Sequence, residues 1–333
     1  MGVLKKEPII NYSSSHTLLD GKIPHLKNKD TVRIKGKSIV GDAPKAIIRK
    51  YEYGSALRAN HKSWPTYIAK VGQKWYPIES ITEQLFTDIG KLLKLNIADS
   101  ELWLTSGQLR FLSKFFLQKD ERLIHGAEIY AAYLNQDLDF ILDLEQNRLS
   151  KEFLTFTFTF EVIEALYEEC KEEIVSSLVK MITFDAITGN SDRHFYNWGI
   201  IEDIRGKKSP RFAPIYDTAR GLFWNYPDSK LFNIYSNSTI EEQIVKYCND
   251  SKPKIGAEDN PNLNHFDFIQ FLCVHYEEYI PVIQTIIDNY DSSDFEELLF
   301  KNYSYLLTDL RKQFIFDCIE HRVTKLYYIL NHT

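Results

Sequence analysis

One stretch, residues 188–201 (Thr-Gly-Asn-Ser-Asp-Arg-His-Phe-Tyr-Asn-Trp-Gly-Ile-Ile), limits what this chain can fold into more than any other. Apolar residues at helical spacing lead into it: Ile174, Leu178, Met181 and Ile182. Gly189 and Asn190 follow, and both residue types tolerate the positive φ with which helices commonly end. The sequence therefore predicts a helix that stops just before a polar loop.

The polar loop carries Asp192 and Asn197, five residues apart. Residues 198–201 then read as a strand, and after a turn residues 211–216 read as a second strand that ends at Asp217. The order helix, loop, hairpin, aspartate suits phosphoryl transfer. In that chemistry one carboxylate orients the attacking hydroxyl, while an amide oxygen and a second carboxylate hold Mg²⁺.

Each of these three residues has a simpler explanation when it is taken alone. Aspartate and asparagine favour loops, where most of them only accept hydrogen bonds from nearby backbone amides. The preceding helix and the following hairpin favour the functional interpretation. We therefore predict that Asp192 is the catalytic base or hydroxyl-orienting group and that Asn197 and Asp217 are magnesium ligands.

The motifs at residues 189–199 (Gly-Asn-Ser-Asp-Arg-His-x-x-Asn-Trp-Gly) and 213–217 (Ala-Pro-Ile-Tyr-Asp) resemble those of the HipA-like serine/threonine kinases. These bacterial enzymes are related to toxin–antitoxin kinases, with a fold close to that of protein and phosphatidylinositol kinases. The resemblance implies a two-lobed α+β fold, with a β-rich N-lobe over residues 1–117 and a helical C-lobe over residues 118–333. It also implies ATP and Mg²⁺, and a kinase core without the extra N-terminal segment of longer HipA proteins.

A lysine near the end of the strand at residues 64–71, Lys70, is the candidate for gripping the nucleotide phosphates. That role requires a carboxylate partner on the next helix, which Pro77 opens and which carries Glu79 and Glu83 in its first turns. Periodicity does not choose between the two glutamates, and surface placement of both is the simpler alternative. The family resemblance favours Glu83, with Glu79 as the fallback.

A glycine-bearing segment at residues 36–46 precedes an apolar strand and is a candidate phosphate-covering loop. Its backbone amides, with Lys45, would approach phosphate oxygens, although two glycines and a proline usually make only a surface turn. Beside the later motifs the segment resembles the family's Ser-x-Ser-Gly-x-x-x-Lys loop. Ser38 holds the first serine position, Val40 replaces the second, and Gly41 and Lys45 complete the expected nucleotide contacts.

The segment from Glu101 to Leu117 reads as a β-hairpin whose turn is supplied by Gly107. In two-lobed kinases the second strand of such a hairpin leads to the hinge between the lobes. We expect the adenine ring near Lys114, Phe115, Phe116 and Leu117, although an aromatic core strand explains each side chain equally well. His194, inside the catalytic motif, is a further candidate nucleotide contact, with a structural hydrogen bond as the favoured alternative.

The rest of the chain gives coarser expectations. Residues 1–35 are expected to be irregular, His125 and Gly126 to form a turn, and the chain from about residue 127 onward to be mostly helical. Residues 218–262 are expected to be a loop region with one short helix that begins near Ser238. Three to four helices are expected at the C-terminal end, over residues 263–331.

Composition excludes some function classes. The formal net charge of −6 argues against direct nucleic-acid binding through a basic surface. The N-terminus carries no apolar segment typical of a signal peptide, no apolar run reaches the length of a membrane span, and the four cysteines show no CxxC pair. We therefore expect a soluble cytoplasmic protein that does not bind membranes.

Three functional hypotheses follow from these residues. The first is an ATP-dependent serine/threonine protein kinase, whose partners would be ATP, a protein substrate of unknown identity and, by the resemblance, a small antitoxin protein. The second keeps the fold and changes the acceptor to a small molecule or a lipid headgroup. The third is a non-catalytic nucleotide-binding partner module.

Overall fold

The computed structural model describes residues 4–14, 22–34, 44–54, 57–147, 149–153, 155–258 and 260–333 of the chain. Most of the predicted phosphate-covering loop, including Ser38 and Gly41, lies outside these described residues. Lys45, at the end of that segment, lies inside them.

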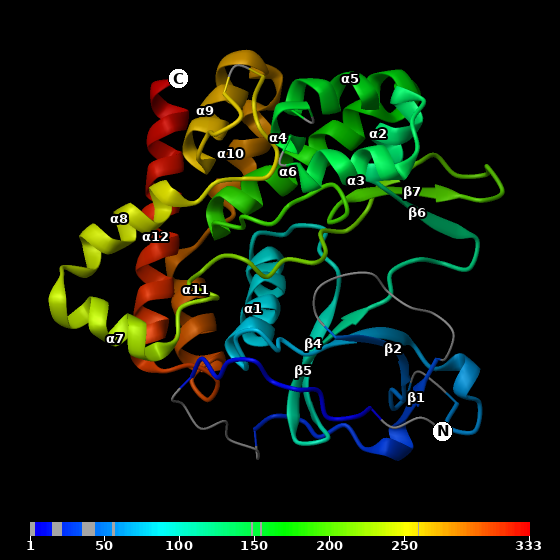
Figure 1. Ribbon diagram of the computed structural model, residues 1–333, viewed down its shortest axis with the longest axis vertical. Coiled ribbons are helices and arrows are strands. Elements are labelled where there is room, and N and C mark those ends of the chain that lie inside the picture. Colours follow the sequence, from blue (N-terminus) through cyan, green and yellow to red (C-terminus); the bar gives the residue numbers. More distant parts are fainter. Residues whose placement is uncertain are drawn as a thin grey trace.

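The N-terminal part is built on a five-stranded antiparallel sheet in the order β1-β2-β3-β5-β4. Its strands are β1 (Thr31–Arg33), β2 (Lys45–Lys50), β3 (Thr66–Lys70), β4 (Ser100–Thr105) and β5 (Gln108–Lys114). The predicted hairpin is β4 and β5, whose pairing closes at Thr105 and Gln108 around Ser106 and Gly107. Figure 1 shows this sheet at the bottom of the molecule, below the helices.

Helix α1 (Ile78–Leu92) covers the sheet and also joins it to the helical part. Its buried stripe contains Ile81, Leu85 and Ile89, which repeat at the four-residue spacing of one helix face. On another side of the helix, the Tyr303 hydroxyl donates a 2.7 Å hydrogen bond to the Asp88 carboxylate. This contact anchors α1 to the helical part of the molecule.

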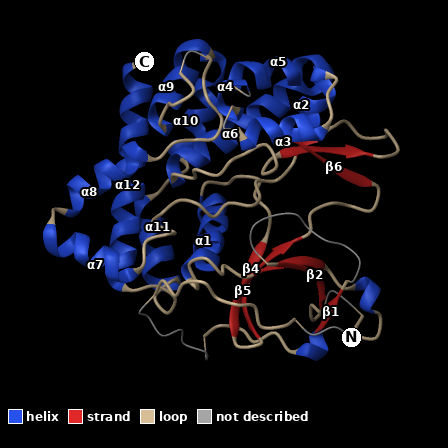
Figure 2. Cartoon of the chain, viewed as in Figure 1, coloured by secondary structure: helices blue, strands red, loops and turns tan. Residues whose placement is uncertain are grey.

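The C-terminal part is mainly helical, as Figure 2 shows, and contains a small three-stranded sheet in the order β6-β7-β8. The strands are β6 (Glu121–His125), β7 (Gly199–Asp203) and β8 (Arg211–Phe212). The first helices are α2 (Gly126–Leu134), α3 (Leu138–Gln146), α4 (Ser150–Phe153), α5 (Phe156–Leu166) and α6 (Lys171–Thr188). The others are α7 (Asp228–Asn237), α8 (Ile240–Asp250), α9 (His265–His275), α10 (Ile280–Asp288), α11 (Ser292–Glu297) and α12 (Asp309–His332).

The two parts share one large hydrophobic core. It runs from α1, through α6 at the centre of the helical part, to the long C-terminal helix α12. A second, smaller cluster fills the other face of the five-stranded sheet, with Leu4, Leu26, Ile48, Tyr67, Ala69 and Leu112 buried in it. The predicted two-lobed α+β fold is confirmed, with a small β-rich lobe and a larger helical lobe joined by continuous packing.

Three local expectations differ from the structure. His125 ends β6 and caps α2, where its backbone N–H donates to the Glu128 carboxylate, so His125 and Gly126 do not form a simple turn. Residues 218–262 contain two helices rather than one, since α7 precedes the predicted α8. Residues 31–33, expected to be irregular, form an edge strand of the sheet. None of the helices in the described ranges is long and apolar enough to cross a bilayer.

Candidate active site

Lys70, the last residue of β3, brings the two lobes together. Its Nζ lies 2.6 Å from Oδ1 of Asp217, which follows β8, and it also bonds the carboxylate of Glu83 on α1. The side chain is 8% exposed. Burial lowers the pKa of Lys70, but the two carboxylates outweigh it and hold that pKa above its ordinary value, so the ammonium stays charged.

Of the two glutamates left open by the sequence, the structure pairs Glu83 with Lys70. Burial raises the pKa of Glu83, against the opposing effect of the Lys70 charge. Glu79 lies one turn earlier on α1 and accepts hydrogen bonds from the backbone N–H groups of Lys74 (3.1 Å) and Trp75 (3.4 Å). Glu79 therefore fixes the loop before α1 rather than meeting Lys70.

Lys45 reaches the same carboxylate from the neighbouring strand. In the β2–β3 pairing Lys45 lies directly opposite Lys70, and its Nζ is 3.2 Å from Oδ2 of Asp217. Asp217 has a φ of 53°, a left-handed conformation that is uncommon for a residue other than glycine. Burial raises its pKa, but the charges of Lys70 and Lys45 prevail and hold that pKa well below the ordinary value. Asp217 is thus an anion held between two ammonium groups.

The loop after α6 begins at Gly189, which ends the helix with a φ of 66°. A Cβ atom at this position would lie 2.7 Å from the Arg322 side chain, so glycine fits both the conformation and the space. Farther along the loop, Nδ2 of Asn197 donates a 2.7 Å hydrogen bond to the Asp192 carbonyl. Because the amide nitrogen is anchored in this way, the Oδ1 of Asn197 is left to accept other contacts.

Arg193 connects this loop to helix α6 and to the residue before Asp217 through four hydrogen bonds. It is 1% exposed and binds the Asp185 carboxylate of α6 through two 2.9 Å hydrogen bonds. Its Nη1 also donates to the carbonyls of Asn197 and Tyr216, both at 2.8 Å. One guanidinium nitrogen therefore joins the loop that carries Asn197 to the residue just before Asp217.

The Asp192 carboxylate faces Arg220, which approaches it at 3.0 Å through Nε and 3.1 Å through Nη1. Burial raises the pKa of Asp192 above its ordinary value, although Arg220 opposes this rise. His194 accepts a 3.2 Å hydrogen bond from the Tyr196 backbone N–H on its Nδ1, and burial lowers its pKa. His194 therefore makes a structural hydrogen bond within the loop, which is the alternative favoured by the sequence analysis.

The expected adenine segment connects β5 to β6. Lys114 points its Nζ toward Glu52 at 3.8 Å, and the Phe115 side chain is 43% exposed. Phe116 packs on the Tyr216 ring, with their centroids 5.7 Å apart, which brings the segment beside the residue before Asp217. Leu117 is half-buried.

The donor set at this site suits a magnesium ion that is shared with phosphates. A carboxylate at Asp217 and an amide oxygen at Asn197 are the hard oxygen ligands that Mg²⁺ prefers. Within the described part of the chain, no three His, Cys, Asp or Glu side chains are grouped to hold a metal by themselves. An ion here would therefore take its other ligands from phosphate oxygens and water, as Mg²⁺ commonly does beside nucleotides.

Sequence reasoning assigned no role to Arg193 or Asp185. The available signal was Asp185 itself, a carboxylate between Met181–Phe184 and Ala186–Ile187, which are all buried on α6. A charge in such a place is normally paired, and Arg193, eight residues on, is the partner. Tyr216 was also missed, although its hydroxyl meets His125 Nδ1 at 2.9 Å and donates to the Tyr196 carbonyl at 3.1 Å.

A family model described as the HipA-like C-terminal domain matches residues 37–271, which include Lys70, Asp192, Asn197 and Asp217. The match extends over more than half of the chain. The chain belongs to the HipA-like family. The resemblance given by the motifs at residues 189–199 and 213–217 is thereby confirmed.

Among curated relatives of this HipA-like chain is the serine/threonine-protein kinase CtkA of Helicobacter pylori, 26% identical over 156 residues. That alignment covers 44% of this chain, and the chain spans just under half, 46%, of that relative's length.

Among solved structures, that of the H. pylori proinflammatory kinase CtkA superposes with a TM-score of 0.72 at 15% identity. The superposition covers 93% of this chain and 97% of the other, so the two share a fold. The HipA of Shewanella oneidensis MR-1, solved with HipB and operator DNA, reaches a TM-score of only 0.46 at 13% identity, over 90% of this chain and 66% of that one. A score that low supports no argument about this chain.

Proposed function

We propose that this HipA-like chain is an ATP- and Mg²⁺-dependent serine/threonine protein kinase. The observation that carries the proposal is the Lys70 ammonium, buried between Glu83 of the small lobe and Asp217 of the helical lobe. Phosphoryl transfer needs positioned positive charge and oxygen ligands more than covalent chemistry, and this arrangement provides both. The alignment with a protein named as a serine/threonine kinase supports the same conclusion.

Lys70 and Lys45 supply the positive charge. Both ammonium groups contact Asp217, so a triphosphate that approaches this carboxylate meets two cations already in place. Mg²⁺, when bound by Asp217 and Asn197, would neutralise phosphate charge and draw the phosphates to the same point. Glu83 keeps the Lys70 side chain extended toward Asp217, which makes Glu83 a positioning residue.

Asp192 is proposed to be the base that takes the proton from the attacking substrate hydroxyl. The acceptor hydroxyl forms a bond to the γ-phosphorus, the bond from that phosphorus to the β-phosphate oxygen breaks, and ADP leaves. The hydroxyl proton passes to the Asp192 carboxylate. Burial raises the pKa of Asp192, which makes the carboxylate a better base than an exposed aspartate, while Arg220 keeps it oriented at 3.0 Å.

The adenine ring is proposed to lie against the segment Lys114–Leu117. There the rings of Phe116 and Tyr216 pack together, with their centroids 5.7 Å apart. Because Lys114 turns toward Glu52, backbone groups and Phe116 are better candidates for this contact than the Lys114 ammonium. An antitoxin partner stays a prediction from the family resemblance.

A transfer assay tests the proposed function. The purified chain is incubated with [γ-³²P]ATP and MgCl₂, with casein and myelin basic protein as generic acceptors. Label should enter the chain itself or an acceptor. Asp192→Asn and Asp217→Asn should each reduce transfer by about 100-fold or more. The matched control Asp309→Asn removes a carboxyl that is 95% exposed on α12 and should transfer like the wild type.

Two results would count against a protein kinase. One is absence of label on any protein, with ATP left intact. The other is undiminished transfer by Asp192→Asn. Label that appears only on an added metabolite or lipid would instead favour the small-molecule alternative.

A further inference from the structure

A small pocket lies beside the catalytic loop, with room for about one water-sized group (about 10 Å³). Residues of the loop and of four other segments line it: Tyr130, Glu145, Ser150, Arg193, His194, Phe195, Trp198, Lys254 and Ile255. Lys254 therefore lies across a single pocket from His194, two residues after Asp192. Trp198, which is 1% exposed, has no hydrogen-bond partner for its Nε1 among the described residues.

Two more lysines lie next to Lys254. The segment that carries Lys252 and Lys254 follows α8 and is tied to the catalytic loop by a 3.1 Å hydrogen bond from the Ser251 hydroxyl to the Gly189 carbonyl. The same segment packs on α4, since a Cβ at Gly256 would lie 2.8 Å from the Lys151 carbonyl. Two separate parts of the chain thus bring Lys151, Lys252 and Lys254 together, and we call these three residues the basic cluster.

The charges of the basic cluster are poorly compensated. Among the described residues, Lys254 has one carboxylate within ion-pair distance, Glu145, at 3.8 Å, which is long for a charge-assisted hydrogen bond. Lys151 and Lys252 form no ion pair within the part of the chain that the structure describes. Burial lowers the pKa of Lys151, and the charges of Lys254 and Lys252 lower it further. Three neighbouring cations are notable in a chain with a net charge of −6.

We propose that the basic cluster binds acidic side chains that flank the acceptor hydroxyl in the protein substrate. The proposal rests on the proposed kinase function, which puts the hydroxyl at Asp192. An acidic side chain at the mouth of the pocket would meet the Lys254 ammonium, which would give up its 3.8 Å contact to Glu145. Lys151 and Lys252 would attract further carboxylates on either side.

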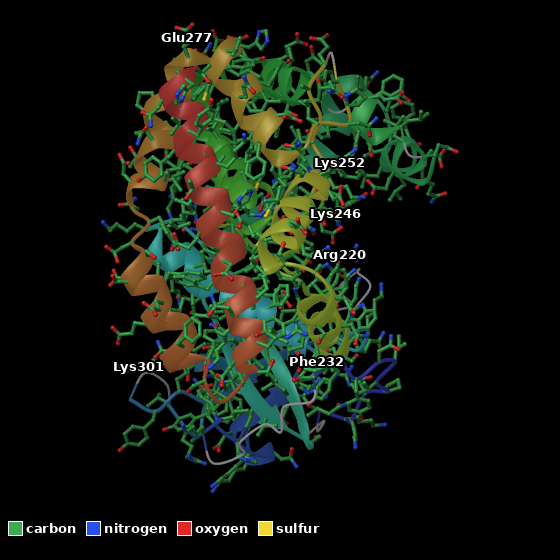
Figure 3. All side chains as sticks on the ribbon, turned by 90° about the vertical axis from the view of Figure 1, so that its left-hand side faces the viewer. Arg220, Phe232, Lys246, Lys252, Glu277 and Lys301 are labelled. Atoms are coloured by element: carbon green, nitrogen blue, oxygen red, sulfur yellow. The ribbon has the colours of Figure 1, made fainter. Side chains whose placement is uncertain are left out.

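An acidic protein segment fits better than a nucleic acid. The basic cluster is compact and lies beside one small pocket, whereas a nucleic-acid surface needs a long basic stripe along which phosphates can run. The helices that border the cluster also carry acidic residues, among them Glu241, Glu242 and Asp250 on α8. Figure 3 shows Lys252 and Arg220 on the same side of the molecule. The Lys254 charge lies close enough to the Asp192 carboxyl to lower its pKa, so the cluster borders the proposed site of the acceptor hydroxyl.

A binding measurement tests this inference without requiring catalysis. Two fluorescein-labelled 12-residue peptides carry one central serine, flanked by glutamates in one and by glutamines in the other. Fluorescence anisotropy is measured at low salt with the full chain. The glutamate peptide should bind about tenfold more tightly than the glutamine peptide, and K151Q/K252Q/K254Q should abolish this difference. The matched control K29Q/K62Q/K301Q changes the net charge equally at exposed lysines elsewhere and should preserve the difference.

Circular dichroism verifies that each variant folds. Equal binding of the two peptides by the wild type would overturn the proposal, and so would an equal loss in the two triple variants. A single-stranded oligonucleotide serves as a third probe. If only the oligonucleotide binds, and K151Q/K252Q/K254Q releases it, the cluster is a nucleic-acid site and the proposal is wrong. The anisotropy measurement does not depend on phosphoryl transfer, so a chain without kinase activity still gives a result.

Discussion

The Nζ of Lys70, in the small lobe, lies 2.6 Å from Oδ1 of Asp217, in the helical lobe. This ion pair joins the two lobes at the point where a nucleotide is proposed to bind. Glu83 holds the other side of the same ammonium. Because all three groups interact, removing any one of them changes the pKa values of the others.

Lys70→Met should destabilise the protein by about 3–5 kcal/mol, because it leaves the buried Glu83 carboxylate without its partner. The double variant Lys70→Met/Glu83→Gln removes both charges and should recover much of that loss. Neither variant should transfer phosphate. Urea unfolding measures the free energies, and a double variant as unstable as Lys70→Met would contradict the explanation that the unpaired Glu83 carboxylate causes the loss.

Arg193→Ala should also destabilise the protein by about 3–5 kcal/mol, because Asp185 is then buried with its charge unpaired. Arg193→Lys keeps the charge but cannot form the two bonds to Asp185 together with those to the Asn197 and Tyr216 carbonyls. It should therefore lose activity with a smaller loss of stability. Unfolding and transfer assays on both variants decide this, and a fully active Arg193→Lys would contradict the role of Arg193 in connecting the loop.

Arg220→Gln should shift the pH dependence of activity. The Arg220 charge opposes the rise that burial causes in the pKa of Asp192, so its removal lets that pKa rise further. A base must be ionised to act, and therefore the acidic limb of the kcat/KM profile should move to higher pH. The control Arg205→Gln removes an exposed arginine that pairs with Asp120 and should leave the profile in place. If the acidic limb of the Arg220→Gln profile stays at the wild-type pH, Arg220 does not affect the pKa of Asp192 and the prediction is wrong.

Glu121→Gln should weaken the fold at neutral pH but not in strong acid. Hydrogen bonds from Arg211 on β8 lower the pKa of Glu121 on β6 from 4.5 to about 2. A lowered folded-state pKa means stability that is present above pH 4.5 and is lost as the pH falls toward 2. At pH 7 the free energy of unfolding of the wild type should exceed that of Glu121→Gln by about 1 kcal/mol, and this difference should disappear between pH 4.5 and 2. Glu297→Gln, at an exposed pair on the surface, is the control, and a gap that does not vary with pH would exclude this explanation.

The sequence predicts the parts of the site that local pattern specifies. The helix that ends at Gly189, the five-residue spacing of Asp192 and Asn197, and the hairpin before Asp217 all follow from short-range rules. Periodicity left Glu79 and Glu83 equivalent, because both lie off the apolar stripe of α1. Only the packing of α1 on the sheet distinguishes them, since it buries Glu83 against Lys70 and turns Glu79 toward the backbone of the preceding loop.

Long-range contacts account for what the sequence did not predict. Arg193 acts through Asp185, eight residues away, and through the Tyr216 carbonyl, and no local pattern connects these groups. Strand β6 was missed because its five residues pair with β7, which lies more than seventy residues later in the chain. Helix α7 was missed because Asn, Ser and Lys dominate its exposed positions, while only Asp228 and Leu231 are buried.

The most direct test of the central claim, a single nucleotide site shared by both lobes, is calorimetric titration of a non-hydrolysable ATP analogue with and without Mg²⁺. The wild type should bind the analogue, and Mg²⁺ should tighten binding by about tenfold or more. Lys70→Met should weaken binding, Asp217→Asn should lose the effect of Mg²⁺, and Asp192→Asn should bind like the wild type. Analogue binding that is unchanged in both Lys70→Met and Asp217→Asn would contradict the account.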